Sequence, residues 1–235
     1  MRICILHIGF ANPAVTSKHQ PSPIRFQNLL NPFMQDAQWS VVNCVEDQLP
    51  SQAEKYDGYL ITGGKYSVFD DLPWQHQLFE FIRSVYQCHI PIVGICYGHQ
   101  AIAHALGGKV ERFTGGWGVG INQVTSHDLA DWMQPPQQTL NLLAMHQDQV
   151  TQMPAGSNRY LSSDFCAISG FFEDRRLLAI QQHPEFTPEL CQDLIERRKD
   201  RIGDIYNEAM DSLGTKHNGG IVGQWIAHFY DPKTI

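Results

Sequence analysis

The sequence predicts an α/β fold built on a mostly parallel central sheet with a mixed or antiparallel extension. In the first half of the chain, short apolar runs bounded by turn residues alternate with helix-like segments. This alternation is typical of parallel strands joined by right-handed crossover helices. After Gly108, strand-like runs follow one another with only turns between them, which indicates that the sheet continues with mixed or antiparallel strands.

The expected parallel strands are short, apolar and free of charged residues in their centres. They are the runs at 2–9, 39–45, 57–64 and 90–96. Continuous apolar runs of this length are typical of strands that are buried on both faces. We therefore expect helices to lie between these four strands in the chain.

Three helices are expected in the first half. One begins near Ser22, a candidate cap, with Pro23 in a first-turn position that suits proline. A second covers 73–87, where apolar residues recur three and four positions apart. The third covers 98–108 and ends in a glycine pair, which is typical of a helix C-terminus.

The second half begins with short strand-like runs at 109–113, 118–124, 140–146, 159–163, 167–173 and 177–183. The glycines at 113–120 precede a strand rather than a helix and lack a following GK[ST], so they predict a turn and not a phosphate-binding loop. Thr187 can cap another helix, and 220–230 has its apolar residues on one helical face. No linker, repeat or low-complexity segment is visible. We expect one domain over 1–235, with a core at about 1–186 and a helical C-terminal extension at 187–235.

The overall charge excludes some classes of partner. Seventeen lysines and arginines against 24 aspartates and glutamates give a formal net charge of −7, which disfavours nucleic acid. The basic run at 196–201 is interpreted as the solvated face of a helix. No run approaches the roughly 20 apolar residues of a membrane span, and the apolar start fits a buried strand better than a signal peptide.

The six cysteines are scattered along the chain. They form no C-x-x-C pair and no cluster with histidine at zinc-ligand spacing. We expect a reduced, cytoplasmic protein without a metal or a cofactor, and no chemical role for five of the six thiols.

Cys96 differs from the other cysteines because it lies between Gly94 and Gly98, where a strand gives way to a helix. A sharp strand-to-helix turn strains the residue at its tip, and small residues two positions away relieve the crowding. Such an exposed elbow at a helix N-terminus favours a thiolate. Alone, the pattern is equally compatible with a core cysteine in a glycine-rich turn.

A base for this thiol is found in the His183-Pro184-Glu185 segment. Side chains two residues apart in an extended chain share a face, so Glu185 can orient His183 as the third member of a triad. If the preceding strand is parallel, both lie at the same carboxyl edge of the sheet as Cys96. Taken by itself, the tripeptide would be read as a surface turn before a capped helix.

Backbone N–H groups that could stabilise an oxyanion are also available. The Tyr97 N–H directly follows the elbow, and Gly64 follows a strand in a Gly-Gly pair whose backbone is free to turn inward. The alternative for the glycine pair is a plain strand-to-helix turn.

Together, these segments resemble the class I (triad) glutamine amidotransferases. The family's G-x-C-x-G-x-Q elbow is present as G-I-C-Y-G-H-Q, followed by H-P-E and preceded by the glycine-rich T-G-G-K. The resemblance spans roughly 1–186. The segments ALGGKV and MHQDQV are most similar to the glutaminase domain of GMP synthases and to stand-alone relatives, including γ-glutamyl peptidases.

The resemblance implies a flavodoxin-like three-layer sandwich, with helices on both faces of the sheet. It also implies hydrolysis of the γ-amide of glutamine, or of a related γ-glutamyl compound, through a Cys96-His183-Glu185 triad and a γ-glutamyl thioester. Gly64 and Tyr97 would form the oxyanion hole. The substrate would be held by family-equivalent residues, which are Gln100, His146, Gln147 and Asp148.

Two functions within the family stay open. The chain could supply ammonia to a synthetase subunit, or it could act alone as a γ-glutamyl peptidase; it lacks the S-G-G-x-D-S loop of an ATP-pyrophosphatase domain. Proteins related to DJ-1 share the elbow but take their histidine from elsewhere, and folate-type γ-glutamyl hydrolases are usually secreted. A non-catalytic module would be expected to lack a triad member, whereas all three are present here.

Overall fold

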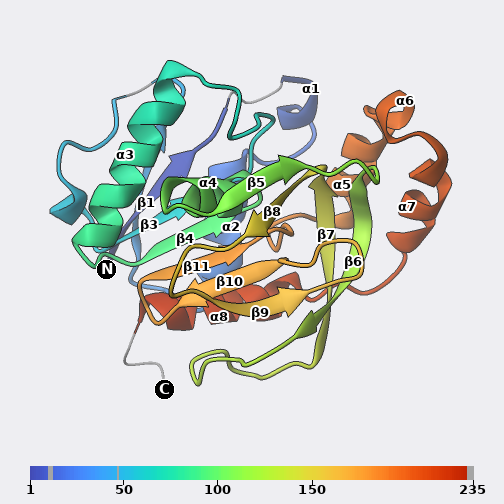
Figure 1. Cartoon of the computed structure of the whole chain (residues 1–235). Helices are drawn as coiled ribbons and strands as arrows, with labels where there is room; N and C mark the ends of the chain where they lie inside the picture. The colour runs from blue at the N-terminus through green and yellow to red at the C-terminus, as the bar shows by residue number, and fades with distance from the viewer. Residues whose placement is uncertain (10–12, 47, 232–235) are drawn as a thin grey trace.

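A nine-stranded sheet forms the centre of the molecule (Figure 1). The computed structural model describes residues 1–9, 13–46 and 48–231. The strand order in the large sheet is β2-β1-β3-β4-β11-β10-β9-β6-β7, and β5 and β8 form a separate two-stranded sheet. The strands are β1 (Arg2–His7), β2 (Gln38–Asn43), β3 (Gly58–Ile61), β4 (Ile92–Ile95), β5 (Lys109–Arg112), β6 (Gly118–Ser126), β7 (Thr139–His146), β8 (Asp148–Gln152), β9 (Asn158–Ser162), β10 (Gly170–Glu173) and β11 (Leu177–Ile180).

The sheet is parallel in one part and antiparallel in the other. Strands β2, β1, β3, β4 and β11 pair in parallel, whereas β10, β9, β6 and β7 continue the sheet in antiparallel fashion. This confirms the α/β fold with a mostly parallel centre and an antiparallel extension. The parallel pairing of β11 with β4 brings Ile180 opposite Ile95, so the segments that follow these two residues leave the sheet at the same edge.

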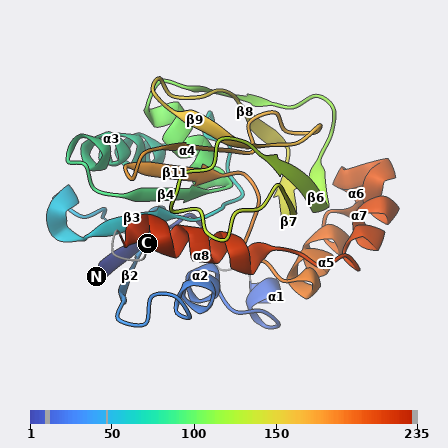
Figure 2. The ribbon, with the colours of Figure 1, turned by 90° about the horizontal axis from the view of Figure 1, so that it is seen from below.

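Helices cover both faces of the sheet, as Figure 2 shows from below. Helices α3 (Pro73–Gln87) and α4 (Tyr97–Ala105) lie on one face, and α2 (Ser22–Leu30) and α8 (Gly219–Tyr230) on the other. The remaining helices are α1 (Pro13–Thr16), α5 (Pro188–Glu196), α6 (Lys199–Ile202) and α7 (Tyr206–Ser212), with short 3-10 turns at Ala53–Lys55 and Gly203–Ile205. Among the described residues, no helix has the length and apolar character needed to cross a bilayer.

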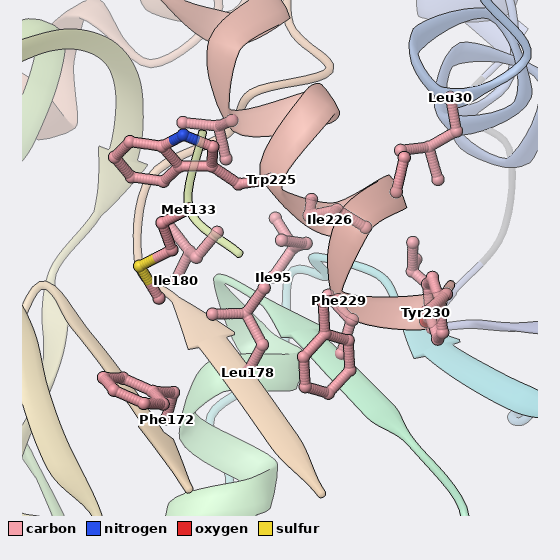
Figure 3. Close-up of a cluster of buried hydrophobic side chains, with 14 of the residues drawn as sticks. Leu30, Ile95, Met133, Phe172, Leu178, Ile180, Trp225, Ile226, Phe229 and Tyr230 are labelled. Atoms are coloured by element: carbon pink, nitrogen blue, oxygen red, sulfur yellow. The ribbon is translucent and has the colours of Figure 1, made fainter. Parts of the chain in front are cut away.

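The C-terminal helix belongs to the main hydrophobic core. Trp225, Ile226 and Phe229 of α8 are at most 1% exposed. They pack with Ile95 and Ile180 in one cluster that also includes residues of α2 (Figure 3). The segment beyond residue 186 therefore contributes a covering layer of the sheet.

The ends of several elements differ by a few residues from those expected. Thr187 caps α5 through a 3.3 Å hydrogen bond from the Leu190 N–H, as expected. Ser22 does not cap α2: it lies inside the first turn, and Pro21 occupies the cap position. Gly107 has a φ of +87° just beyond α4, a left-handed conformation that glycine adopts without steric cost and that ends a helix.

Candidate active site

Cys96 lies at a strained turn between β4 and α4. Its φ of 53° and ψ of −100° are unusual for a residue other than glycine. A Cβ atom on Gly94 would collide with the backbone of Gly98, and one on Gly98 would collide with the backbone of Ile61. Both glycines are therefore required for strand, turn and helix to approach so closely.

The thiol of Cys96 is less accessible than expected from an exposed elbow. The residue is 6% exposed and also borders the main hydrophobic core, because the sheet edge is covered by the segments around it. It still lines a cavity of about 720 Å³ at this edge. The nucleophile predicted from the sequence thus lies at the wall of a pocket and not on an open surface.

His183 and Glu185 lie at the same edge of the sheet as Cys96. The His183 Nδ1 atom is 2.8 Å from the Glu185 Oε1 atom, and both His183 and Cys96 lie beside Gly63. The His183 N–H donates to the Leu143 carbonyl at 2.8 Å, and its ring stacks on Phe186 with centroids 3.8 Å apart. These contacts fix the position and the plane of the imidazole.

The environment of His183 favours the protonated ring. Burial by itself lowers the pKa of His183, but the Glu185 carboxylate and Cys96 outweigh that effect, so the pKa lies above its ordinary value. A positively charged imidazole beside Cys96 is the arrangement that stabilises a thiolate. The three residues thus have the arrangement expected of a nucleophile, a base and an orienting carboxylate.

The two glycines of the candidate oxyanion loop have different neighbours. A Cβ atom on Gly63 would lie 2.5 Å from His183 Cε1 and 3.4 Å from Cys96 Cβ, whereas one on Gly64 would meet Ile8. Both glycines line the cavity, and the Gly63 position must stay free of a side chain to admit the imidazole.

Tyr97, whose N–H is the other candidate donor, is held firmly by its side chain. Its hydroxyl accepts a 2.9 Å hydrogen bond from Gln75 Nε2, and its ring packs against Trp74. The residue also lines the cavity. These side-chain contacts fix the first turn of α4 next to Cys96.

The four candidate substrate-binding residues all line the cavity, which brings Gln100, His146, Gln147 and Asp148 to one site. The Gln100 amide donates to the Asp148 carbonyl at 2.9 Å and to Gln181 Oε1 at 3.1 Å. Its hydrogens are therefore engaged with the protein, so its direct effect is to position the Asp148 segment. Burial lowers the pKa of His146 to about 4, which keeps that ring neutral.

Asp148 is part of a polar network that the sequence does not reveal. Its carboxylate accepts a hydrogen bond from the Ser67 hydroxyl and forms an ion pair with Arg112, with Nε and Oδ1 2.8 Å apart. Arg112 also donates to the Ser67 hydroxyl at 2.9 Å. The pairing of β5 with β8 places Arg112 opposite Asp148, and β8 is a strand that the sequence analysis does not predict.

The basic run at 196–201 is exposed to solvent as expected, except that Arg198 is half-buried, but its arginines also border the cavity, which the sequence analysis does not predict. Arg197, Arg198 and Arg201 line the cavity, together with Arg25 from α2. Helix α5 ends at Glu196 and α6 begins at Lys199, so the run spans the break between these two helices and does not continue one helix.

The remaining histidines of α4 and the other cysteines lie outside the cavity lining. His99 is fully buried against Phe171 and neutral, since burial lowers its pKa to about 3, whereas His104 is exposed. Four of the other five thiols are buried as expected, but Cys88 is only partly buried.

Comparison with known proteins gives consistent matches. The family profile "Glutamine amidotransferase class-I" matches residues 27–199. A Saccharomyces cerevisiae protein with glutamine amidotransferase in its name is 31% identical over 72% of this chain and 70% of its own length. "Gamma-glutamyl peptidase 3" of Arabidopsis thaliana is 28% identical over 68% of each chain.

A GMP synthase of Geobacillus kaustophilus is 36% identical over 54% of this chain, but the match covers only 24% of that protein. Among solved structures, a glutamine amidotransferase from Methylobacillus flagellatus superposes with a TM-score of 0.75 at 20% identity, covering 97% of this chain and 92% of the other. At that identity the superposition supports the flavodoxin-like layered fold.

Proposed function

The chain belongs to the class I glutamine amidotransferases, and from that premise we propose that it hydrolyses the γ-amide of glutamine or of a related γ-glutamyl compound. The observation that supports this best is the convergence of Cys96, His183 and Glu185 on one cavity, with His183 hydrogen-bonded to Glu185 and close enough to Cys96 for that thiol to raise its pKa. The arrangement supplies a thiolate, a proton donor beside it and a carboxylate that holds the donor in place.

The proposed reaction has two stages. The Cys96 thiolate attacks the γ-carbonyl, and the N–H groups of Gly64 and Tyr97 stabilise the oxyanion. His183 gives its proton to the departing nitrogen, which leaves as ammonia or an amine and forms a γ-glutamyl thioester. Neutral His183 then takes a proton from water, whose oxygen attacks the thioester, releasing glutamate and the thiol of Cys96.

The far end of the γ-glutamyl group needs partners for an ammonium and a carboxylate. We propose that Asp148 faces the α-amino group and that Arg112 beside it faces the α-carboxylate, with Gln100, His146 and Gln147 shaping this wall of the cavity. Asp148 and Arg112 form an ion pair with each other, so this wall of the cavity presents one negative and one positive group to the ammonium and the carboxylate of the substrate.

Replacement of Cys96 tests the nucleophile directly. Cys96→Ala is expected to abolish hydrolysis of glutamine and of γ-glutamyl dipeptides, since no other thiol lines the cavity among the described residues. Cys88→Ala, which removes a partly buried thiol elsewhere, is the matched control and should retain activity. Mass spectrometry after treatment with an electrophilic glutamine analogue should find the label on Cys96 in wild type, and activity of Cys96→Ala within about tenfold of wild type would contradict the proposal.

A second candidate function is a stand-alone γ-glutamyl peptidase. Its support is that the match to Gamma-glutamyl peptidase 3 covers 68% of that protein, against 24% for the GMP synthase. Turnover of γ-glutamyl dipeptides by the purified chain alone would favour the peptidase. Glutaminase activity that appears only when a cell extract is added would favour a subunit that feeds ammonia to a synthetase.

A further inference from the structure

The cavity around Cys96 has a charge opposite to that of the whole chain. Six basic side chains line it, against two carboxylates, Asp148 and Glu185, although the chain carries a formal net charge of −7. The basic residues are Lys65, Arg25, Arg112, Arg197, Arg198 and Arg201. A concave site with this excess of cations attracts and concentrates anionic ligands.

Both carboxylates in the cavity already have partners. Asp148 is paired with Arg112, and Glu185 with His183. The arginines at 25, 197, 198 and 201 form no ion pair with any carboxylate in the described part of the chain. Four guanidinium groups therefore border the cavity without an ion pair among the described residues, and only Arg25 lies near enough to a carboxylate, that of Glu185, for its charge to act on it.

Other contacts hold these arginines in place. Arg197 Nη2 donates to the Ala14 carbonyl at 2.8 Å, and Arg201 lies over the ring of Trp117 at 5.1 Å from its centroid. Arg198 is partly buried and close enough to its neighbours that burial, followed by Arg201 and Arg197, lowers its pKa. Arg197 and Arg198 lie between α5 and α6, and Arg201 lies in α6. Figure 1 shows α5 beside β6 and β7.

Arg25 and Arg198 lie near the reacting groups, where the leaving group must depart: Arg25 contacts Phe186, and the charge of Cys96 acts on Arg198. His183 protonates the departing nitrogen, so that nitrogen must lie within reach of the imidazole. His183 stacks on Phe186, and Arg25 lies over the same Phe186 ring at 5.6 Å from its centroid. Ser67, Arg112 and Asp148 form a separate network that suits the γ-glutamyl end.

We propose that Arg25, Arg197, Arg198 and Arg201 bind an anionic group on the leaving amine, so that the preferred substrate is a γ-glutamyl compound whose amine bears carboxylate or phosphate. This inference rests on the proposed function and adds the chemical class of the leaving group. A cavity of about 720 Å³ has room for such a ligand, because it falls within the size range of sites that enclose molecules larger than one amino acid. Glutamine itself, which releases ammonia, would leave these arginines without a ligand.

The substrate series that tests this uses four compounds with the same γ-glutamyl group. They are glutamine, γ-glutamyl-methylamine, γ-glutamyl-glycine and γ-glutamyl-phosphoethanolamine. Wild type is expected to show a kcat/KM at least about tenfold higher for an anionic amine than for methylamine, the minimum for one charge-assisted hydrogen bond. The last two compounds decide whether the anion is carboxylate or phosphate.

The variant Arg198→Gln/Arg201→Gln assigns the preference to the cluster. The ratio of kcat/KM for γ-glutamyl-glycine to that for γ-glutamyl-methylamine should fall by about tenfold to 100-fold. Arg159→Gln removes a charge from an exposed position of β9, outside the cavity lining, and should leave the ratio unchanged. If the double variant does not fold, as judged by its thermal unfolding, the wild-type rates on the four compounds alone decide whether an anionic amine is preferred.

Two outcomes would overturn the inference. One is that wild type hydrolyses γ-glutamyl-methylamine and γ-glutamyl-glycine equally well. The other is that the double variant hydrolyses both compounds more slowly but with an unchanged ratio of kcat/KM, which would place the arginines at the γ-glutamyl end. Failure of the proposed function is distinct from either. In that case wild type hydrolyses none of the four compounds, or Cys96→Ala hydrolyses them as fast as wild type.

Discussion

The charge on His183 is set by two neighbours that act against its burial. His183 is only 5% exposed, and this burial favours the neutral ring. Glu185 and Cys96 favour the cation and raise the pKa of His183. The cation is the form needed to protonate a departing amine. The stacking of Phe186 on the ring keeps water away from this pair, which strengthens the interaction between the charges.

Removal of the Glu185 charge should therefore change the pH dependence of the reaction. The protonated ring is present below its raised pKa and is lost as the pH rises through it. Glu185→Gln removes the negative charge that counteracts the effect of burial, so the pKa of His183 falls. The alkaline limb of the kcat/KM profile should then move to lower pH. Glu80→Gln, at an exposed position of α3, is the control and should leave the pH dependence unchanged.

The same variants separate proton transfer from orientation. Glu185→Gln should lower kcat less than His183→Ala, because glutamine can still position the ring, whereas alanine removes the proton donor. Equal losses, or an alkaline limb that does not move, would indicate a different role for Glu185.

Asp148 is expected to act on binding more than on chemistry. Asp148→Ala should raise KM for glutamine more than it lowers kcat, because the carboxylate is proposed to bind the α-amino group, which is remote from the reacting carbonyl. The exposed Asp131→Ala is the matched control. An unchanged KM would remove Asp148 from the binding site.

The triad residues can be found from the sequence because each lies in a short local pattern. The elbow glycines flank Cys96, and Glu185 is two residues from His183, so local geometry predicts their contacts. Ser67 and Arg112 cannot be found this way, since Arg112 meets Asp148 only through the pairing of β5 with β8, and Ser67 reaches it from the segment between β3 and α3. The arginines at 197–201 escape prediction because a charged run gives no information about where its helix ends.

At the scale of elements, the elbow depends on two glycines that let β4, α4 and β3 approach closely. Gly98→Ala should lower the free energy of unfolding by about 1–3 kcal/mol, because the new methyl group has no space against the Ile61 backbone. Gly220→Ala is the control: a Cβ atom there would have no neighbour within 4 Å, so stability should be unchanged or slightly higher. Chemical denaturation measures both, and equal values would contradict the packing described for the elbow.

The elements themselves are predicted with different success for a physical reason. Helix 73–87 has both a proline at its first turn and a strong apolar periodicity, and the structure begins and ends α3 at these residues. Strand ends are less predictable: the run expected at 57–64 pairs only over Gly58–Ile61. The residues that follow Ile61 are Thr62, Gly63 and Gly64, which do not exclude an extended chain, so only the partner strands decide where pairing stops.

At the scale of the whole molecule, the C-terminal segment has two different roles. Its first part, α5 and α6, brings arginines to the cavity, while α8 covers the sheet face opposite α3 and α4. The described chain is therefore proposed to fold as one unit in which the site and the core share residues. Cys96 itself belongs to the cluster that contains Trp225 and Phe229.

This shared core gives a prediction about the stability of the site. Trp225 is 1% exposed and its indole N–H donates to the Pro135 carbonyl at 3.0 Å, so Trp225→Ala leaves both a cavity and an unpaired acceptor. We expect the free energy of unfolding to fall by about 3–5 kcal/mol. The exposed Lys216→Ala, just before α8, should change it by less than about 0.5 kcal/mol.

The position of Trp225 under the sheet makes the effect on activity informative. If α8 were an appendage to a self-sufficient core at 1–186, loss of Trp225 would lower neither the stability nor the labelling of Cys96 by an electrophilic glutamine analogue. Because Trp225 packs in the same cluster as Ile95 and Cys96, we expect the melting temperature to fall and Cys96 labelling to be lost at that lower temperature, in step with unfolding. Labelling that persists above the melting transition would show that the elbow keeps its shape without the α8 layer, and would contradict a shared core.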